Sequence, residues 1–261
     1  MKTLKNPSWR LKSPADLEKL RAGGRRLAEI IARLKRAVRP GLATAELENL
    51  ARKQIAAIGG RPAFLNYRPR AARRPFPAAL CVSINDEVVH GIPGRRLLLE
   101  GDIVTLDLGL EYEGRFTDMA VTVPVGAVSS AARKLLTVTA EALARGLEAA
   151  RVGQTLGDIS AAIQSFVEPQ GFGLVREFGG HGVGFRVHED PEVSNCGRAG
   201  AGPKLVSGLV IAIEPMVTIG APDIIIDVDG YTVKTKDGRL AAHFEHTVAV
   251  TDRGPEILTT I

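Results

Sequence analysis

Residues 101–125 read GDIVTLDLGLEYEGRFTDMAVTVPV, and this stretch decides the fold. Two alternating apolar runs, 102–114 and 114–125, are joined by the segment EYEG, a pattern typical of a β-hairpin. One acid interrupts the alternation in each run, Asp107 in the first and Asp118 in the second. Burying a carboxylate without a partner is costly. We therefore expect these two acids to share a partner.

The pattern of this hairpin returns later in the chain. The stretch GLVIAIE matches GDIVTLD and aligns Glu214 with Asp107. The stretch FEHTVAV matches FTDMAVTV and aligns Glu245 with Asp118. Chance can supply one such match, but a series of matches in the same order indicates an internal repeat.

Helical patterns precede both hairpins. Apolar residues recur at three- and four-residue steps over 14–38, after Ser13-Pro14, a favourable N-cap and first-turn pair. A second helix is predicted from a cap near Thr44 to a stop at Gly59-Gly60, and a strand over 78–86 follows it.

The helical pair is repeated in the second half of the chain, over 129–150 and 153–173. Helix pairs followed by hairpins bury their apolar faces best when they pack together. The sequence therefore predicts an α+β fold in one domain, 1–261, with two related halves at about 14–126 and 129–252.

The four aligned acids are expected to meet near the axis that relates the two halves. Without a cation between them they would repel one another. His181, inside GGHGVG, adds a nitrogen, and carboxylates with one imidazole suit Mn, Fe(II) or Co rather than a structural zinc site. Two such ions activate a water and polarise a carbonyl. The alternative is that the acids pair with Arg or Lys at strand ends. We expect the glycines around His181 to let backbone and substrate approach the ions.

The composition indicates a soluble globular protein. The 261 residues are 45% hydrophobic and 24% charged. No apolar run approaches the ~18 residues that a membrane span needs, and the N-terminus has no apolar core of a signal peptide. Two cysteines, Cys81 and Cys196, are too few for a disulfide framework. We expect a cytoplasmic monomer.

Positive charge is concentrated in two places. Residues 1–39 carry twelve Lys or Arg against three acids, and YRPRAARRPF carries four arginines, Arg68, Arg70, Arg73 and Arg74. A solvated helix face and a charged loop explain these clusters, and attraction to ribosomal RNA is the alternative. No RNA-binding motif is recognisable, and neither DNA nor a membrane is an expected partner.

The remaining histidines that we considered are His90, His188 and His243. Taken singly, each is expected to be a surface residue or a satisfied core residue. His90 stands out because its HGIPG echoes the HGVGF that begins at His181.

The chain resembles the type I methionine aminopeptidases, which form subfamily A of peptidase family M24. The motifs that carry the resemblance are SINDEVVHGIPG, VTLDLGLEYEGRFTDMAVT, EFGGHGVGFRVHEDPEV, VIAIEPMV and YTVKTKDGRLAAHFEHTV. The resemblance covers nearly the whole chain. It implies the pita-bread fold, in which two pseudo-symmetric halves form a central antiparallel sheet backed by helices. It also implies removal of the initiator methionine from nascent proteins when the second residue is small.

The resemblance implies a role for each motif residue. The metal ligands would be Asp107, Asp118, His181, Glu214 and Glu245. Asp118 and Glu245 would bridge two divalent ions, Co, Mn or Fe(II), with Zn as a further option. His188 would face the scissile carbonyl and steady the tetrahedral intermediate, and His90 would bind the substrate backbone beside the scissile bond. Glu214 would also handle the proton of the attacking water.

The expected methionine pocket departs from the family pattern. Its residues would be Tyr67, Phe76, Cys81, Val187 and Tyr231. Val187 stands where family members typically have Phe, Tyr231 where they often have Trp, and Phe64 where many bacterial members have a small residue or Cys. Losing a Phe-sized wall is worth about 1–3 kcal/mol of discrimination. Catalysis is therefore better supported than a strict methionine preference.

The family loop YHG[FY]P appears here as YRPRAARRPFP, which lacks the histidine after Tyr67 and is several residues longer. We expect this insert, 68–74, to lie exposed beside the active-site mouth. It either helps to hold the enzyme near ribosomal RNA or only lines the substrate entrance.

Two other functions stay open. A proline-specific peptidase of the same fold usually has an extra N-terminal domain, for which this chain has no room. A metal-free peptide-binding module would be expected to lose ligands. The long helical insertion of the type II methionine enzymes is not found between Glu214 and Glu245.

Overall fold

The computed structural model describes residues 9–69 and 74–261. The helices are α1 (Pro14–Ala37), α2 (Thr44–Ala57), α3 (Ser130–Ala149), α4 (Leu156–Val167) and the short 3-10 helix η1 (Glu168–Gln170). The strands are β1 (Arg61–Pro62), β2 (Leu80–Ile84), β3 (Glu87–Val89), β4 (Ile103–Tyr112), β5 (Arg115–Pro124), β6 (Gly173–Leu174), β7 (Gly179–Gly182), β8 (Glu189–Ser194), β9 (Val210–Ile213), β10 (Met216–Thr218), β11 (Ile224–Ile226), β12 (Val233–Thr235), β13 (Ala241–His243), β14 (His246–Thr251) and β15 (Gly254–Ile257). Helices are combined with antiparallel sheets, so the predicted α+β class is confirmed.

The first helix begins as predicted. The Ser13 hydroxyl accepts a hydrogen bond of 3.2 Å from the Asp16 amide, and the Asp16 carboxylate accepts one of 2.9 Å from the Ser13 amide. The second helix is capped near Thr44, as predicted. Its N-cap is Ala43, whose amide donates to Glu46, because the Thr44 hydroxyl is bonded to the backbone of Gly94.

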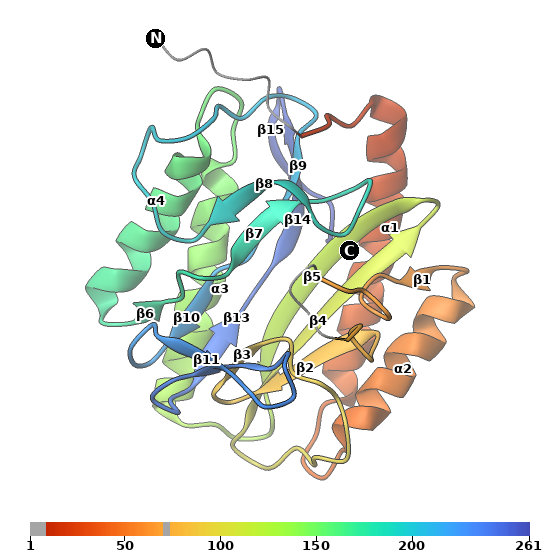
Figure 1. Cartoon of the computed structure of the whole chain (residues 1–261), viewed down its shortest axis with the longest axis vertical. Helices are drawn as coiled ribbons and strands as arrows, with labels where there is room; N and C mark the ends of the chain where they lie inside the picture. Colours follow the sequence, from red (N-terminus) through yellow and green to blue (C-terminus); the bar gives the residue numbers. More distant parts are fainter. Residues whose placement is uncertain (1–8, 70–73) are drawn as a thin grey trace.

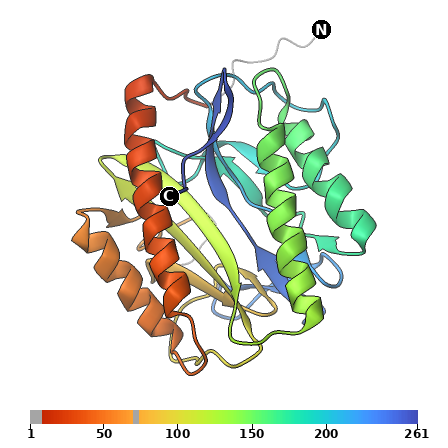
Figure 2. The same cartoon turned by 180° about the vertical axis from the view of Figure 1, so that it is seen from behind.

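The helices and the strands form two layers. Figure 2 shows the four long helices covering one face of the strands, and Figure 1 shows the strands from the other side. One apolar core joins α1 and α2 to β2, β4 and β5, and a second joins α3 and α4 to the C-terminal strands. Phe244 packs against both cores. The division of one domain into two homologous halves stays a prediction.

The β4–β5 hairpin meets the C-terminal strands where β5 approaches β14 (Figure 1). Strand β4 pairs with β5 in one sheet, and β14 pairs with β9 in another. The Glu245 amide donates 2.9 Å to the Ala120 carbonyl, and the Thr122 hydroxyl donates 2.8 Å to the His243 carbonyl. Main-chain and threonine contacts therefore hold the acid-bearing strands together. In the part of the chain that the structure describes, none of the helices has the length and apolar character to cross a membrane.

Candidate metal centre and active site

The structure brings the four predicted acids together in the protein interior. Asp107 lies in β4 opposite Ala120, and Asp118 lies in β5 opposite Gly109. Glu214 follows β9 directly and Glu245 lies between β13 and β14. Their exposed fractions are 7% for Asp107, 2% for Asp118, 8% for Glu214 and 2% for Glu245. The β4–β5 hairpin and the β9–β14 strand pair thus contribute to one acidic cluster. The expected second hairpin was wrong, because β10 to β13 lie between β9 and β14 in the chain.

Ligand atoms in this cluster form three overlapping groups. Asp107, Asp118 and Glu245 form one group, and His181, Glu214 and Glu245 form another. The third contains Asp118, His181 and His188. Within each group the ligand atoms all lie within 4.8 Å of one another. This spacing allows one cation to contact several of them.

His181 presents one ring nitrogen to the acids. Its Nδ1 lies 2.9 Å from the Gly182 carbonyl, which fixes Nδ1 as the donor. Its Nε2 lies 3.5 Å from Glu214 Oε1 and 3.9 Å from Asp118 Oδ2. The unprotonated nitrogen therefore faces the carboxylates, as a metal-ligating imidazole requires.

The glycines beside His181 allow close packing of the backbone. A Cβ on Gly180 would lie 2.1 Å from the Ala212 carbonyl oxygen, and one on Gly182 would lie 2.2 Å from that of Asp190. Both glycines therefore allow β7 to approach the backbone of its neighbours. Gly179 and Gly180 also line the cavity described below, and the expectation that these glycines let substrate approach the ions stays a prediction.

The electrostatics of the cluster favour a cation. Burial, and then the neighbouring acids, raises the pKa of Asp118 and Glu245 well above the usual range. Burial also raises the pKa of Asp107 and of Glu214. Within residues 9–69 and 74–261, Asp107 Oδ1 and Glu245 Oε1 are buried without a hydrogen-bond partner. In the same ranges, the nitrogens close to Asp118 and Glu214 belong to histidines, not to the Arg or Lys partners of the alternative hypothesis. The residues present therefore fit divalent cations.

His243 was underestimated by the sequence interpretation. It is neither a surface residue nor a satisfied core residue, because its side chain is buried and both ring nitrogens lack hydrogen-bond partners. Its Nε2 lies 3.4 Å from Glu214 Oε2, on the opposite carboxylate oxygen from His181. Burial lowers the pKa of His243 to about 4, so the ring is neutral at pH 7. The only sequence signal was its place two residues before Glu245.

His188 lies beside His181 at the edge of the cluster. The two rings have centroids 4.4 Å apart, and the Tyr67 ring lies 4.9 Å from His188 on another side. Although His188 reaches solvent, burial first, and then the neighbouring His181 and His90, lowers its pKa below the ordinary value. The neutral ring can donate one hydrogen bond into the space next to the acids.

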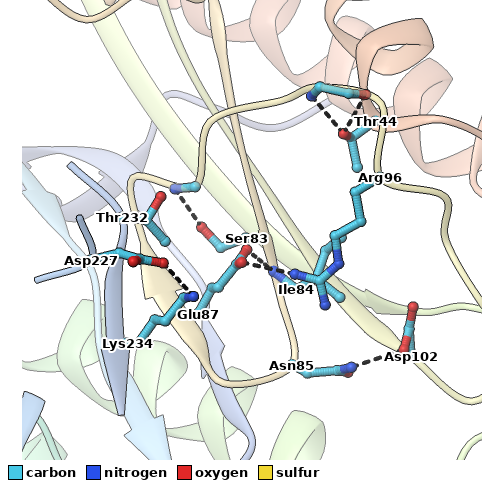
Figure 3. Close-up of polar contacts among 12 residues, drawn as sticks. Thr44, Ser83, Ile84, Asn85, Glu87, Arg96, Asp102, Asp227, Thr232 and Lys234 are labelled. Carbon is cyan, nitrogen blue, oxygen red and sulfur yellow. Dashed lines mark hydrogen bonds and ion pairs between the residues drawn. The ribbon is translucent and has the colours of Figure 1, made fainter. Parts of the chain in front are cut away.

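His90 lies on a loop whose shape is fixed by polar contacts. Its φ is 61°, a left-handed conformation that few residues adopt. Figure 3 shows the contacts that hold this loop: the Ser83 hydroxyl accepts 3.1 Å from the Gly91 amide, and Arg96 pairs with Glu87 at 2.8 Å. Burial lowers the pKa of His90 to about 4. His90 is therefore a neutral side chain in a rigid setting.

A cavity of about 540 Å³ contains the predicted site residues. It is lined by all four acids, His90, His181, His188, Phe64, Tyr67, Phe76, Cys81 and Tyr231. Phe178 and Met216 also line it and were not predicted. Val187 is buried in the same apolar cluster as Phe64, Phe76, Cys81 and Tyr231, but unlike them it does not line the cavity. The cavity thus combines an acidic floor with an apolar wall.

The described part of the insert lies beside this cavity. Pro69 lines the cavity, and the exposed Arg74 donates 2.9 Å to the Asp229 carbonyl. The Tyr231 hydroxyl donates to the Arg74 carbonyl, and the Tyr231 ring contacts the edge of Phe76. Arg70 and Arg73 lie outside the described residues.

Comparisons with known proteins agree with this geometry. Residues 18–252 match the model of metallopeptidase family M24. The chain is 47% identical to the methionine aminopeptidase of Aquifex aeolicus over 254 residues, covering 96% of this chain and 98% of that protein. The crystal structure of methionine aminopeptidase from Rickettsia prowazekii superposes with a TM-score of 0.93 at 38% identity, covering 96% of this chain and 99% of that one.

A second structural likeness is more distant. The Xaa-Pro dipeptidase of Bacillus anthracis gives a TM-score of 0.76 at 21% identity, and the match covers 96% of this chain and 62% of that one. This identity shows the shared fold alone. Together these structures confirm the predicted pita-bread fold.

Proposed function

Because the chain belongs to metallopeptidase family M24, we propose that it is a methionine aminopeptidase, which removes the initiator methionine from nascent proteins when the second residue is small. Relatives that are 41–47% identical over nearly the whole chain carry that name. The observation that carries the proposal is the cluster of four buried carboxylates and His181 in a cavity that also holds His90 and His188.

The proposed cofactor is a pair of divalent ions, Co, Mn or Fe(II), with Zn as a further option. The proposed ligands are Asp107, Asp118, His181, Glu214 and Glu245. Asp118 and Glu245 each belong to two of the three ligand groups, as does His181, and this supports the two acids as bridging ligands. A divalent ion bound here supplies Lewis acidity toward the scissile carbonyl and lowers the pKa of a water.

The protein groups then have separate tasks. Glu214 is the proposed acceptor of the proton from the attacking water, because its carboxylate lines the cavity among the proposed metal ligands, where a bound water would lie. His188 donates a hydrogen bond to the carbonyl oxygen as negative charge develops there. His90 binds the substrate backbone beside the scissile bond.

The proposed methionine pocket is the apolar wall of the cavity. Phe64, Phe76, Cys81 and Tyr231 form one buried cluster, with Tyr67 packed against it. Methionine is unbranched and flexible, so it can fill an irregular apolar space of this kind. The α-amino group would lie against the acidic floor, which restricts cleavage to the first residue.

The ribosome is a proposed partner, and the basic N-terminal region and the Arg68–Arg74 loop are its proposed contacts. The proposed location is the cytoplasm. Exposed arginines such as Arg25, Arg33 and Arg36 on α1 support a contribution of the N-terminal region. Neutralising Arg68, Arg70, Arg73 and Arg74 should weaken ribosome co-sedimentation at low salt. Binding that is unchanged and independent of salt would contradict the proposal.

A peptide panel tests the activity. We expect hydrolysis of Met-Ala-Ser with added Co or Mn, little hydrolysis when the second residue is large, and loss of activity with a chelator. The Xaa-Pro alternative is not favoured, since its similarity is limited to the fold. Preferential cleavage of Xaa-Pro peptides, or activity indifferent to chelator, would overturn the proposal.

A further inference from the structure

A buried lysine ahead of α1 contacts the loop between His181 and His188. The Lys12 side chain is only 1% exposed, and its Nζ lies 2.9 Å from Glu189 Oε2. The Lys12 amide donates 2.8 Å to the Gly208 carbonyl, which anchors this segment beside β9. Lysine is almost never fully buried unless it is paired. Because the Lys12 side chain is buried, a contribution to the solubility of the surface does not explain this ion pair.

The partner of Lys12 shapes the turn next to His188. Glu189 follows His188 in the chain, and its Oε1 accepts hydrogen bonds from the amides of Phe185 and Arg186, the latter at 2.7 Å. Its other oxygen is the one that Lys12 contacts. One carboxylate thus closes the turn on one side and binds the ammonium on the other.

The packing of this loop leaves little freedom for Lys12. A Cβ on Gly184, whose φ is +136°, would lie 2.5 Å from Lys12 Cε. The Gly184 carbonyl accepts 2.8 Å from the Phe116 amide. The Phe185 ring lies near three cations, with centroid distances of 4.1 Å to Arg10, 5.1 Å to Lys12 and 4.9 Å to Arg115. The segment before α1 and the end of the β4–β5 hairpin therefore enclose the loop.

We propose that Lys12 is a positioning residue, whose pairing with Glu189 holds the loop 183–188 so that the His188 ring stays beside His181 and faces the cavity. The role rests on the proposed function, because His188 matters only if the cavity hydrolyses a peptide bond. Without the ammonium, Glu189 would be a partly buried, unpaired charge. It would turn toward water and release the amides of Phe185 and Arg186. A displacement of about 1 Å in a catalytic group can cost about 10²-fold in rate.

The test compares three variants with the wild-type protein. Lys12→Met keeps the apolar stem and removes the charge. Lys12→Met combined with Glu189→Gln removes both charges but keeps an oxygen that can accept from Phe185 and Arg186. Arg21→Met is the matched control, because it breaks an exposed ion pair that α1 makes with Glu256 in β15.

We expect Lys12→Met to lower kcat for Met-Ala-Ser at least tenfold, with KM and Co affinity within about twofold of wild type. The double variant should regain most of this loss, and Arg21→Met should match wild type. NMR of the metal-free proteins should show shifted His188 ring resonances in Lys12→Met only. If Lys12→Met does not fold, the double variant tests the proposal instead. It should fold and show the His188 ring resonances of the wild-type protein.

The outcomes separate this proposal from the proposed function. A wild-type protein that fails to hydrolyse methionine peptides would refute the function. The NMR comparison would still test whether Lys12 holds the His188 ring in place. Wild-type kcat together with unmoved His188 resonances in Lys12→Met would overturn the positioning role. So would a loss of activity that merely follows a loss of Co affinity, or a double variant that recovers neither kcat nor the resonances.

Discussion

The amide of Asp118 donates a hydrogen bond of 2.9 Å to the hydroxyl of Thr247, and that hydroxyl donates one of 2.8 Å back to the Asp118 carbonyl. Thr247 lies two residues after Glu245 and is fully buried. A single hydroxyl therefore contributes two of the hydrogen bonds that tie the strand of Asp118 to the strand after Glu245, the two acids that we propose as bridging ligands.

Replacing Thr247 with valine should weaken both the fold and the metal site. Valine keeps the shape but leaves the Asp118 amide and carbonyl unpaired, which costs about 1–3 kcal/mol in the free energy of unfolding. Affinity for the divalent ions should also fall. Urea unfolding of the metal-free protein and calorimetric titration with Co measure the two effects.

Thr137→Val is the control for this change, because the Thr137 hydroxyl bonds only to its own helix on an exposed face. If Thr247→Val has the same free energy of unfolding and the same Co affinity as this control, the Thr247 hydroxyl does not set the spacing of the acids.

The metal-free protein should lose stability as the pH rises from 6.5 to 8. Burial raises the pKa of Asp107 and of Glu214 to about 7, above the values of the unfolded chain. Such groups favour folding while they are protonated, and this contribution is lost as the pH passes through the raised pKa. Thermal unfolding across this range should therefore show a falling Tm.

Two comparisons check that the acid cluster causes this fall. Saturating Co should flatten the dependence, because the cation offsets the repulsion between the carboxylates. Asp118→Asn should also reduce the slope without any metal. A Tm that rises between pH 6.5 and 8 in the metal-free protein would contradict the assigned shifts. The window lies above pH 6.5, the ordinary pKa of histidine, because there most histidines of the unfolded chain are neutral, as are the buried histidines of the folded chain, whose pKa values are lowered to about 4.

Local patterns predicted the helices, the β4–β5 hairpin and the acids, because hydrophobic period and strand alternation are short-range properties. The internal repeat added the long-range step that brings Glu214 and Glu245 to Asp107 and Asp118. Lys12 and Glu189 are 177 residues apart and have no matching pattern, so only the folded chain relates them. The packing role of the glycines around His181 could not be predicted, because their neighbours, the carbonyls of Ala212 and Asp190, come from other strands.

His243 should matter because its Nε2 lies against the Glu214 carboxylate. The two Glu214 oxygens face different imidazoles, His181 on one side and His243 on the other, at 3.5 Å and 3.4 Å. Groups that hold a metal-ligating carboxylate affect metal affinity about 10–100-fold. His243→Leu should therefore weaken Co binding by an amount in that range and lower kcat.

His243→Gln is the informative companion, since its side-chain amide can still donate to Glu214. We expect it to retain most of the Co affinity that His243→Leu loses. Equal Co affinities in the two variants would show that the volume of the side chain matters at this position and that its nitrogen does not.

His188→Ala distinguishes a catalytic role from a ligand role. His188 shares one ligand group with Asp118 and His181, so it has the position of a possible metal ligand as well as of a hydrogen-bond donor. If it stabilises developing charge on the carbonyl oxygen, kcat and kcat/KM should fall together by about 10²–10³-fold, while Co affinity stays unchanged. If it is a ligand, Co affinity should fall with activity. Calorimetric titration of Co and steady-state hydrolysis of Met-Ala-Ser, measured on the same preparation, separate the two. We expect the first result, because the other two ligand groups leave His188 out and still bring together five side chains, enough to hold the ions without it.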